Sequence, residues 1–115
     1  MNSQARFLQG AFAFEGHGLT KPAPLNDSLA YTVPPDRRAQ LVYFRGGNSS
    51  AELIYVLLVR GGEPMRYFPI GAQGACHVPL RVVEDLAPDT ELAVQVAASE
   101  QVTGTLVVDI GIIES

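Results

Sequence analysis

Glycine and proline interrupt this chain so often that they limit its fold more than any other feature. The 115 residues include 11 glycines and 8 prolines, and nearly all of them fall between short apolar runs. An average helix needs an uninterrupted stretch of about 10–14 residues, which this spacing does not leave. Apolar runs separated by turn residues every 8–12 residues or so are typical of β-sandwiches and barrels. The sequence therefore predicts one all-β domain over residues 1–115.

Eight apolar runs have the length and composition of strands. They span residues 5–15, 28–33, 39–45, 52–60, 65–70, 75–83, 91–98 and 105–113. Two of them alternate between apolar and more polar positions. The apolar positions are Leu92, Val94 and Val96 in one run, and Leu106, Val108, Ile110 and Ile112 in the other. Strands with one dry face belong to antiparallel sheets. We predict an antiparallel β-sandwich of jelly-roll or Greek-key type with about eight strands.

Residues 79–86 allow a second interpretation. Pro79 suits the first turn of a helix, and Leu80, Val83 and Leu86 recur about one helical turn apart. The same residues also fit a strand followed by a loop. Both interpretations stay open from the sequence.

The segment from Leu86 to Ala98, LAPDTELAVQVAA, resembles the part of fibronectin type III domains that crosses from one sheet to the other. In that family a Leu-x-Pro-Gly-Thr-x-Tyr corner precedes an alternating strand. Here Asp89 replaces the glycine, Leu92 replaces the tyrosine, and the chain has no tryptophan for that family's core. The resemblance covers about a tenth of the chain and implies only a Greek-key corner.

One predicted strand is apolar on both faces. In residues 52–60, Ile54, Val56 and Leu58 share one face, while Tyr55 and Leu57 lie on the other together with Leu53 and Val59. Charged residues are only 17% of the chain, against a usual share of about 25%. We expect a neighbouring subunit to cover the second face. The leading hypothesis is a non-enzymatic binding or assembly module that forms a homo-oligomer.

Charge excludes two classes of partner. The net charge is −4 and the pI about 5.0, whereas nucleic acids and anionic membranes select basic surfaces. The longest unbroken apolar run, residues 53–59, is far shorter than the 20 or so residues of a membrane span. The single Cys76 cannot form an internal disulfide. These features predict a cytoplasmic protein without a nucleic-acid or membrane partner.

No motif identifies catalytic residues or a cofactor. The chain has no Gly-x-Ser-x-Gly nucleophile elbow. The segments Arg45-Gly46-Gly47 and Arg60-Gly61-Gly62 are glycine-rich, but neither precedes a helix, as a phosphate-binding loop does. We expect them to be turns, and we predict no catalytic residue and no cofactor.

A metal site is one alternative hypothesis. Glu15 and His17 have the i, i+2 spacing that places two side chains on one face of a strand. With His77 or a residue of a second subunit they would make a ligand set suited to zinc or copper. Cys76 and His77 are adjacent, so in a strand they point to opposite faces and cannot bind one ion together.

A small-molecule site is the other alternative, for a carbohydrate or an anionic metabolite. Tyrosines recur every 12 residues from Tyr31 to Tyr67, and the chain has seven arginines but one lysine. One tyrosine per hairpin strand would also give this spacing, and GC-rich coding would also favour arginine. The candidate ligand-binding residues are Tyr43, Tyr55, Tyr67, Arg45 and Arg66. Asp109, on the less apolar face of the last strand, is expected to lie in solvent.

Overall fold

The computed structural model describes residues 3–115, apart from the side chains of residues 81–84. Within this range the chain is almost wholly β-structure, with one short 3-10 turn, η1 (Asp27–Leu29). The strands are β1 (Gln4–Glu15), β2 (Ala23–Pro24), β3 (Tyr31–Thr32), β4 (Ala39–Asn48), β5 (Ile54–Arg60), β6 (Glu63–Ile70), β7 (Ala75–Leu86), β8 (Glu91–Ala97) and β9 (Thr103–Glu114).

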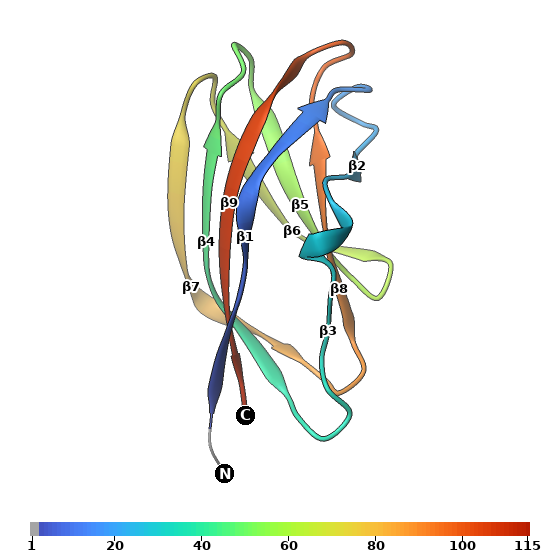
Figure 1. Cartoon of the computed structure of the whole chain (residues 1–115), viewed down its shortest axis with the longest axis vertical. Coiled ribbons are helices and arrows are strands. Elements are labelled where there is room, and N and C mark those ends of the chain that lie inside the picture. The colour runs from blue at the N-terminus through green and yellow to red at the C-terminus, as the bar shows by residue number, and fades with distance from the viewer. Residues whose placement is uncertain (1–2) are drawn as a thin grey trace.

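The strands form two antiparallel sheets packed face to face (Figure 1). One has the order β1-β9-β4-β7, and the other the order β2-β8-β5-β6, with β3 also paired to β8. The prediction of an all-β antiparallel sandwich is confirmed.

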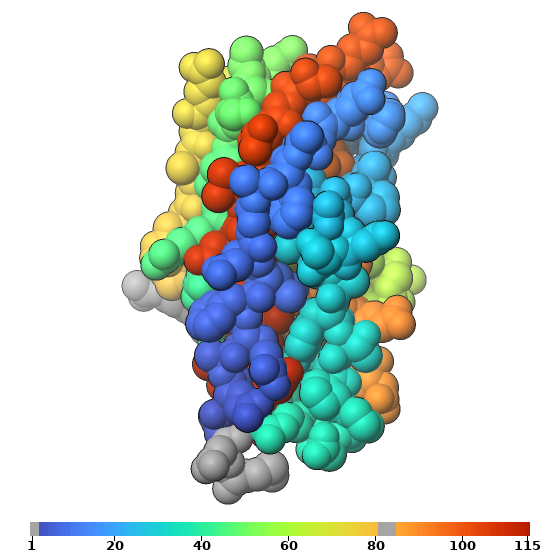
Figure 2. Space-filling view, in the orientation of Figure 1, coloured from blue at the N-terminus to red at the C-terminus, as the bar shows by residue number. Residues whose placement is uncertain are grey.

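The connection between β1 and β4 includes η1, which contacts β1 and lies beside that strand in Figure 2. Among the described residues, no helix is long and apolar enough to cross a membrane.

The core lies between the two sheets, where the alternating strands predicted it. Leu106, Val108, Ile110 and Ile112 of β9 are all at most 1% exposed. Leu92, Val94 and Val96 of β8 face them from the other sheet and are also buried. Burial of a large aliphatic side chain stabilises the fold by about 1.5–3 kcal/mol, so these alternating faces account for much of the cohesion between the sheets.

The strand that is apolar on both faces is β5, and its outer face is already partly covered within the isolated chain. Ile54, Val56 and Leu58 point into the core and are fully buried. On the opposite face, Leu57 is 3% and Val59 is 7% exposed, because side chains of β6 and β8 flank them. The expectation that these two residues need a neighbouring subunit for cover was therefore wrong.

Residues 79–86 form a strand, and the helical interpretation was wrong. They belong to β7, in which Pro79 pairs with Tyr43 and Leu86 pairs with Ala39 of β4. The register between β4 and β7 shifts between Leu41 and Tyr43, so β7 carries extra residues there. An irregular strand of this kind need not follow a strict two-residue period, so the spacing of apolar residues in this segment does not require a helix. Val83 lies outside the described side chains.

The segment that resembles the fibronectin corner does cross between the sheets. Leu86 ends β7 in the four-stranded sheet, and Glu91 begins β8 in the other. Asp89 occupies the corner with a φ of 66°. This left-handed conformation favours glycine, and aspartate is among the few other residues that tolerate it. The substitution of Asp89 for the family's glycine is therefore compatible with the same turn.

A buried carboxylate joins the two sheets near the chain termini. Glu114 of β9 is 1% exposed. One of its oxygens lies 3.2 Å from Nε of Arg6 on β1, and the other accepts a hydrogen bond from the hydroxyl of Tyr31 on β3. Burial, and then the hydrogen bond to Glu114, raise the pKa of Tyr31. The buried carboxylate of Glu114 is therefore stabilised by an ion pair at one oxygen and by a hydrogen bond at the other.

This contact predicts a loss of stability at alkaline pH. Because the pKa of Tyr31 is raised on folding, its stabilising contribution is complete below the ordinary tyrosine pKa of about 10. It is lost as the pH rises from that value through the higher pKa of the folded state. Denaturant unfolding between about pH 8 and pH 11 should show the decline. Tyr31→Phe should decline less steeply, and equal slopes for the two proteins would contradict the assignment.

Candidate functional site

Three strands of the four-stranded sheet bring polar side chains into one row on its outer face. Arg45 of β4 pairs with Asp109 of β9 on one side and with His77 of β7 on the other. Directly opposite residues in neighbouring strands project from the same face, with Cβ atoms about 4.5–5.5 Å apart. Tyr43 lies two residues from Arg45 and so shares this face. We call Asp109, Arg45 and His77 the polar row.

Tyr43 is held against the sheet beside the polar row. Its hydroxyl donates to Oδ1 of Asp109 over 2.9 Å. Its ring covers Gly111, where a Cβ atom would come within 2.1 Å of the ring. The guanidinium carbon of Arg45 is 5.2 Å from the ring centroid, within cation–π range, and the His77 ring meets the Tyr43 ring edge-on at 6.3 Å. Burial, and then the Asp109 hydrogen bond, raise the pKa of Tyr43, which keeps the hydroxyl a donor.

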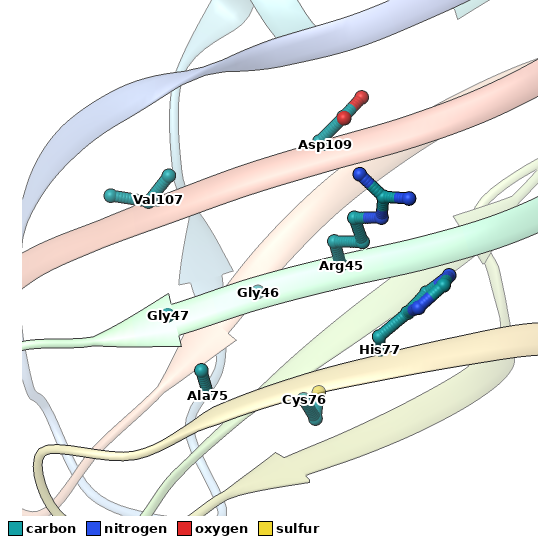
Figure 3. A pocket seen from close by; sticks show the side chains of 8 residues that line it. All are labelled: Arg45, Gly46, Gly47, Ala75, Cys76, His77, Val107 and Asp109. Atoms are coloured by element: carbon teal, nitrogen blue, oxygen red, sulfur yellow. The ribbon is translucent and has the colours of Figure 1, made fainter.

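Small side chains next to the polar row leave an open groove of about 570 Å³. Its lining residues are Arg45, Gly46, Gly47, Ala75, Cys76, His77, Val107 and Asp109. In Figure 3, Arg45 extends from β4 toward Asp109, and His77 projects on the same side from β7. The floor is apolar, because Gly47 pairs with Ala75 and Val107, and Val107 is 53% exposed. The groove therefore combines an apolar floor with one cation, one carboxylate and one imidazole.

Cys76 does not contribute its thiol to the polar row. It pairs with Gly46 and packs against the hydrophobic core, as expected for a neighbour of His77 in a strand. Burial raises the pKa of the Cys76 thiol. The thiol therefore stays protonated at neutral pH, which makes it a poor nucleophile.

The structure divides the candidate ligand-binding residues among three places. Tyr43 and Arg45 lie together in the groove just described. Tyr55 and Tyr67 lie on the outer face of the other sheet, where their ring centroids are 5.5 Å apart. Arg66 pairs with Leu58, whose side chain points into the core, so it belongs to neither group.

The three candidate metal ligands do not all come together, because His77 lies apart from Glu15 and His17. Glu15 and His17 line a second depression with Lys21 and Glu100, at the end of β1. His77 lies in the groove on β7, at the opposite edge of the sheet from β1. Within the described residues, no group of three or more histidine, cysteine, aspartate or glutamate side chains is arranged to hold a metal ion.

Sequence reasoning missed the importance of Asp109 and Gly111. Asp109 was expected in solvent, but it is half-buried and accepts the Tyr43 hydrogen bond. Gly111 provides the space in which the Tyr43 ring lies. The sequence did contain an indication of this site, because an aspartate and a glycine interrupt the otherwise apolar strand β9. Their partners lie more than 60 residues away in β4, so the sequence alone did not identify them.

Comparison with known proteins shows the fold. No family model and no curated protein matches the chain. The chain is similar to the CBM36-1 domain of a multidomain xylanase from the hindgut metagenome of Trinervitermes trinervoides, at 14% identity and a TM-score of 0.58 over 96% of each chain. It is also similar to a family 35 carbohydrate binding module from Clostridium thermocellum, at 11% identity and a TM-score of 0.54, over 95% of this chain and 97% of that one. The chain is thus a β-sandwich with the fold of these modules.

Proposed function

We propose that this protein is a non-catalytic carbohydrate-binding β-sandwich that holds a sugar in the groove beside the polar row. The observation that carries the proposal is the placement of Arg45 and Asp109 on neighbouring strands next to the Tyr43 ring. A sugar hydroxyl both donates and accepts hydrogen bonds, so a guanidinium beside a carboxylate suits adjacent hydroxyls. The apolar floor suits the C–H face of the sugar ring. The two similar structures are themselves carbohydrate-binding modules, which supports the same ligand class.

The charges of the groove favour a sugar over an anionic metabolite. Asp109 stands directly opposite Arg45, so it would repel an anion that approached the guanidinium. The described lining also argues against glycoside hydrolysis, which usually needs two carboxyl groups that flank the scissile bond. Asp109 is the one carboxylate among the residues that line the groove, and the Tyr43 hydroxyl already occupies one of its oxygens.

Arg45→Ala should weaken sugar binding about tenfold or more, because it removes the guanidinium donors of the polar row. The measurement is titration of the ¹⁵N-labelled protein with cellohexaose and with xylohexaose, followed by amide shifts. Arg38→Ala is the matched control, since it removes the same charge from an exposed position between β3 and β4 and should bind like the wild type. Equal affinities for the two variants, or no shifts at the groove with either sugar, would refute the proposal.

Homo-oligomer formation stays a separate prediction. It no longer rests on Leu57 and Val59, which other residues of the same chain cover, but Tyr67, which is paired with Leu57, is 58% exposed. Sedimentation velocity at micromolar concentration distinguishes a monomer from an oligomer. A monomer that binds sugar would leave the carbohydrate proposal intact and remove the assembly hypothesis.

A further inference from the structure

The outer face of the second sheet differs from the groove, because the described residues paired at its centre carry no charge. Register places Tyr55 of β5 opposite Ala97 of β8 and Pro69 of β6, and Leu57 opposite Gln95 and Tyr67. Side chains at these positions share the face that points away from the core. We call Tyr55, Leu57, Tyr67 and Pro69 the tyrosine face.

Two tyrosines dominate the tyrosine face. Their ring centroids are 5.5 Å apart and their planes are tilted by 54°. The Tyr55 hydroxyl donates to the carbonyl oxygen of Leu19 over 2.7 Å, which fixes that ring. Tyr67 is 58% exposed. Because the two planes are tilted, a ligand stacks on one ring at a time, and the accessible Tyr67 ring beside the fixed Tyr55 ring can receive it without rearrangement.

The chemistry of this surface selects an uncharged ligand with an apolar side and polar edges. A charged ligand would lose water here without gaining an ionic partner, which costs free energy. Tyrosine rings provide apolar area, and their hydroxyls add hydrogen bonds at the rim. A neutral pyranose has the complementary form, with C–H groups on its face and hydroxyls around its edge.

We infer that the tyrosine face is a second carbohydrate site, specific for neutral glycans. The inference takes its ligand class from the function proposed for the groove, but it rests on different residues. The groove and the tyrosine face lie on the outer sides of opposite sheets, so one short oligosaccharide cannot occupy both. The protein would therefore bind two glycan chains at once, and it would bind a polymer surface more tightly than a free oligosaccharide.

Depletion of the protein from solution by insoluble polysaccharide tests this site. The probes are microcrystalline cellulose, insoluble xylan and insoluble β-1,3-glucan. We expect the wild type to bind at least one, and Tyr67→Ala to reduce the partition constant about fivefold or more. Tyr67→Phe, which keeps the ring, should retain most of the binding. Tyr67 is exposed, so thermal unfolding of Tyr67→Ala should match that of the wild type and exclude misfolding.

The outcomes separate this inference from the proposal for the groove. If Tyr67→Ala binds like the wild type, or if none of the three polysaccharides is bound, the second site does not exist. Shifts at the Arg45 amide with soluble hexaoses would still support the groove. A wild-type dimer that Tyr67→Ala dissociates, without polysaccharide binding, would assign the tyrosine face to a second copy of the chain and overturn the inference. If Tyr67→Ala loses polymer binding while Arg45→Ala does not change sugar binding, the results would support the tyrosine face and not the groove.

Discussion

Replacing Asn48 with alanine is expected to lower the free energy of unfolding by about 3 kcal/mol. Asn48 ends β4 and is only 4% exposed. Its Nδ2 donates to the carbonyl oxygens of Glu52, Ile70 and Gly71 over 2.8, 3.3 and 3.1 Å. Its Oδ1 accepts from the amide and the hydroxyl of Ser50 over 2.9 and 2.8 Å. One side chain thus joins the end of β4, the corner before β5 and the end of β6.

Alanine at this position removes all five of these hydrogen bonds and leaves the buried amide of Ser50 without its acceptor. The carbonyl oxygens of Gly71 and Glu52 keep the Gly74 amide and the Ser50 hydroxyl as donors. A buried amide without a partner costs about 1–3 kcal/mol, and the methyl group that remains fills little of the space. The matched control is Asn26→Ala, because Asn26 is exposed and caps η1 through the amide of Ser28. That variant should cost about 1 kcal/mol or less. Urea unfolding of both variants measures the difference, and equal losses would show that the Asn48 network is not structural.

Gly111→Ala is expected to cost roughly 1–3 kcal/mol and to disorganise the groove at the same time. The added Cβ would lie 2.1 Å from a carbon of the Tyr43 ring, so the ring must leave its place on β9. Tyr43 then loses its hydrogen bond to Asp109 and its contact with Arg45. If the groove binds sugar, the same substitution should weaken that binding, although Gly111 itself is covered.

A second glycine provides the comparison. Gly71 lies in the turn after β6, has no positive φ, and a Cβ there would meet no atom within 4 Å. Gly71→Ala should therefore change the free energy of unfolding by less than about 0.5 kcal/mol. Denaturant unfolding and the amide shifts of Asp109 give the two readouts. Unchanged shifts in Gly111→Ala would mean that the Tyr43 ring does not depend on this space.

Local pattern was enough to predict the fold class but not every element. Alternation in β8 and β9 identified their buried faces, because a period of two places alternate side chains on one side of a strand. For β5, the pattern led to a wrong inference, that the outer apolar residues need a neighbouring subunit. Leu57 and Val59 are instead covered by neighbouring strands of the same sheet. The pattern also left β7 ambiguous, because a strand with irregular pairing need not follow a strict two-residue period.

The sequence by itself determined that this chain is a sandwich of short antiparallel strands, since frequent turn residues and a two-residue period are local properties. Only the tertiary structure decided which side chains share a surface. Tyr43 and Arg45 meet Asp109 because β9, the last strand, lies between β1 and β4. Tyr67 meets Tyr55 through the register of β5 and β6. Strand order and register depend on pairing between distant segments, and a shift of one residue would move every one of these side chains to the other face.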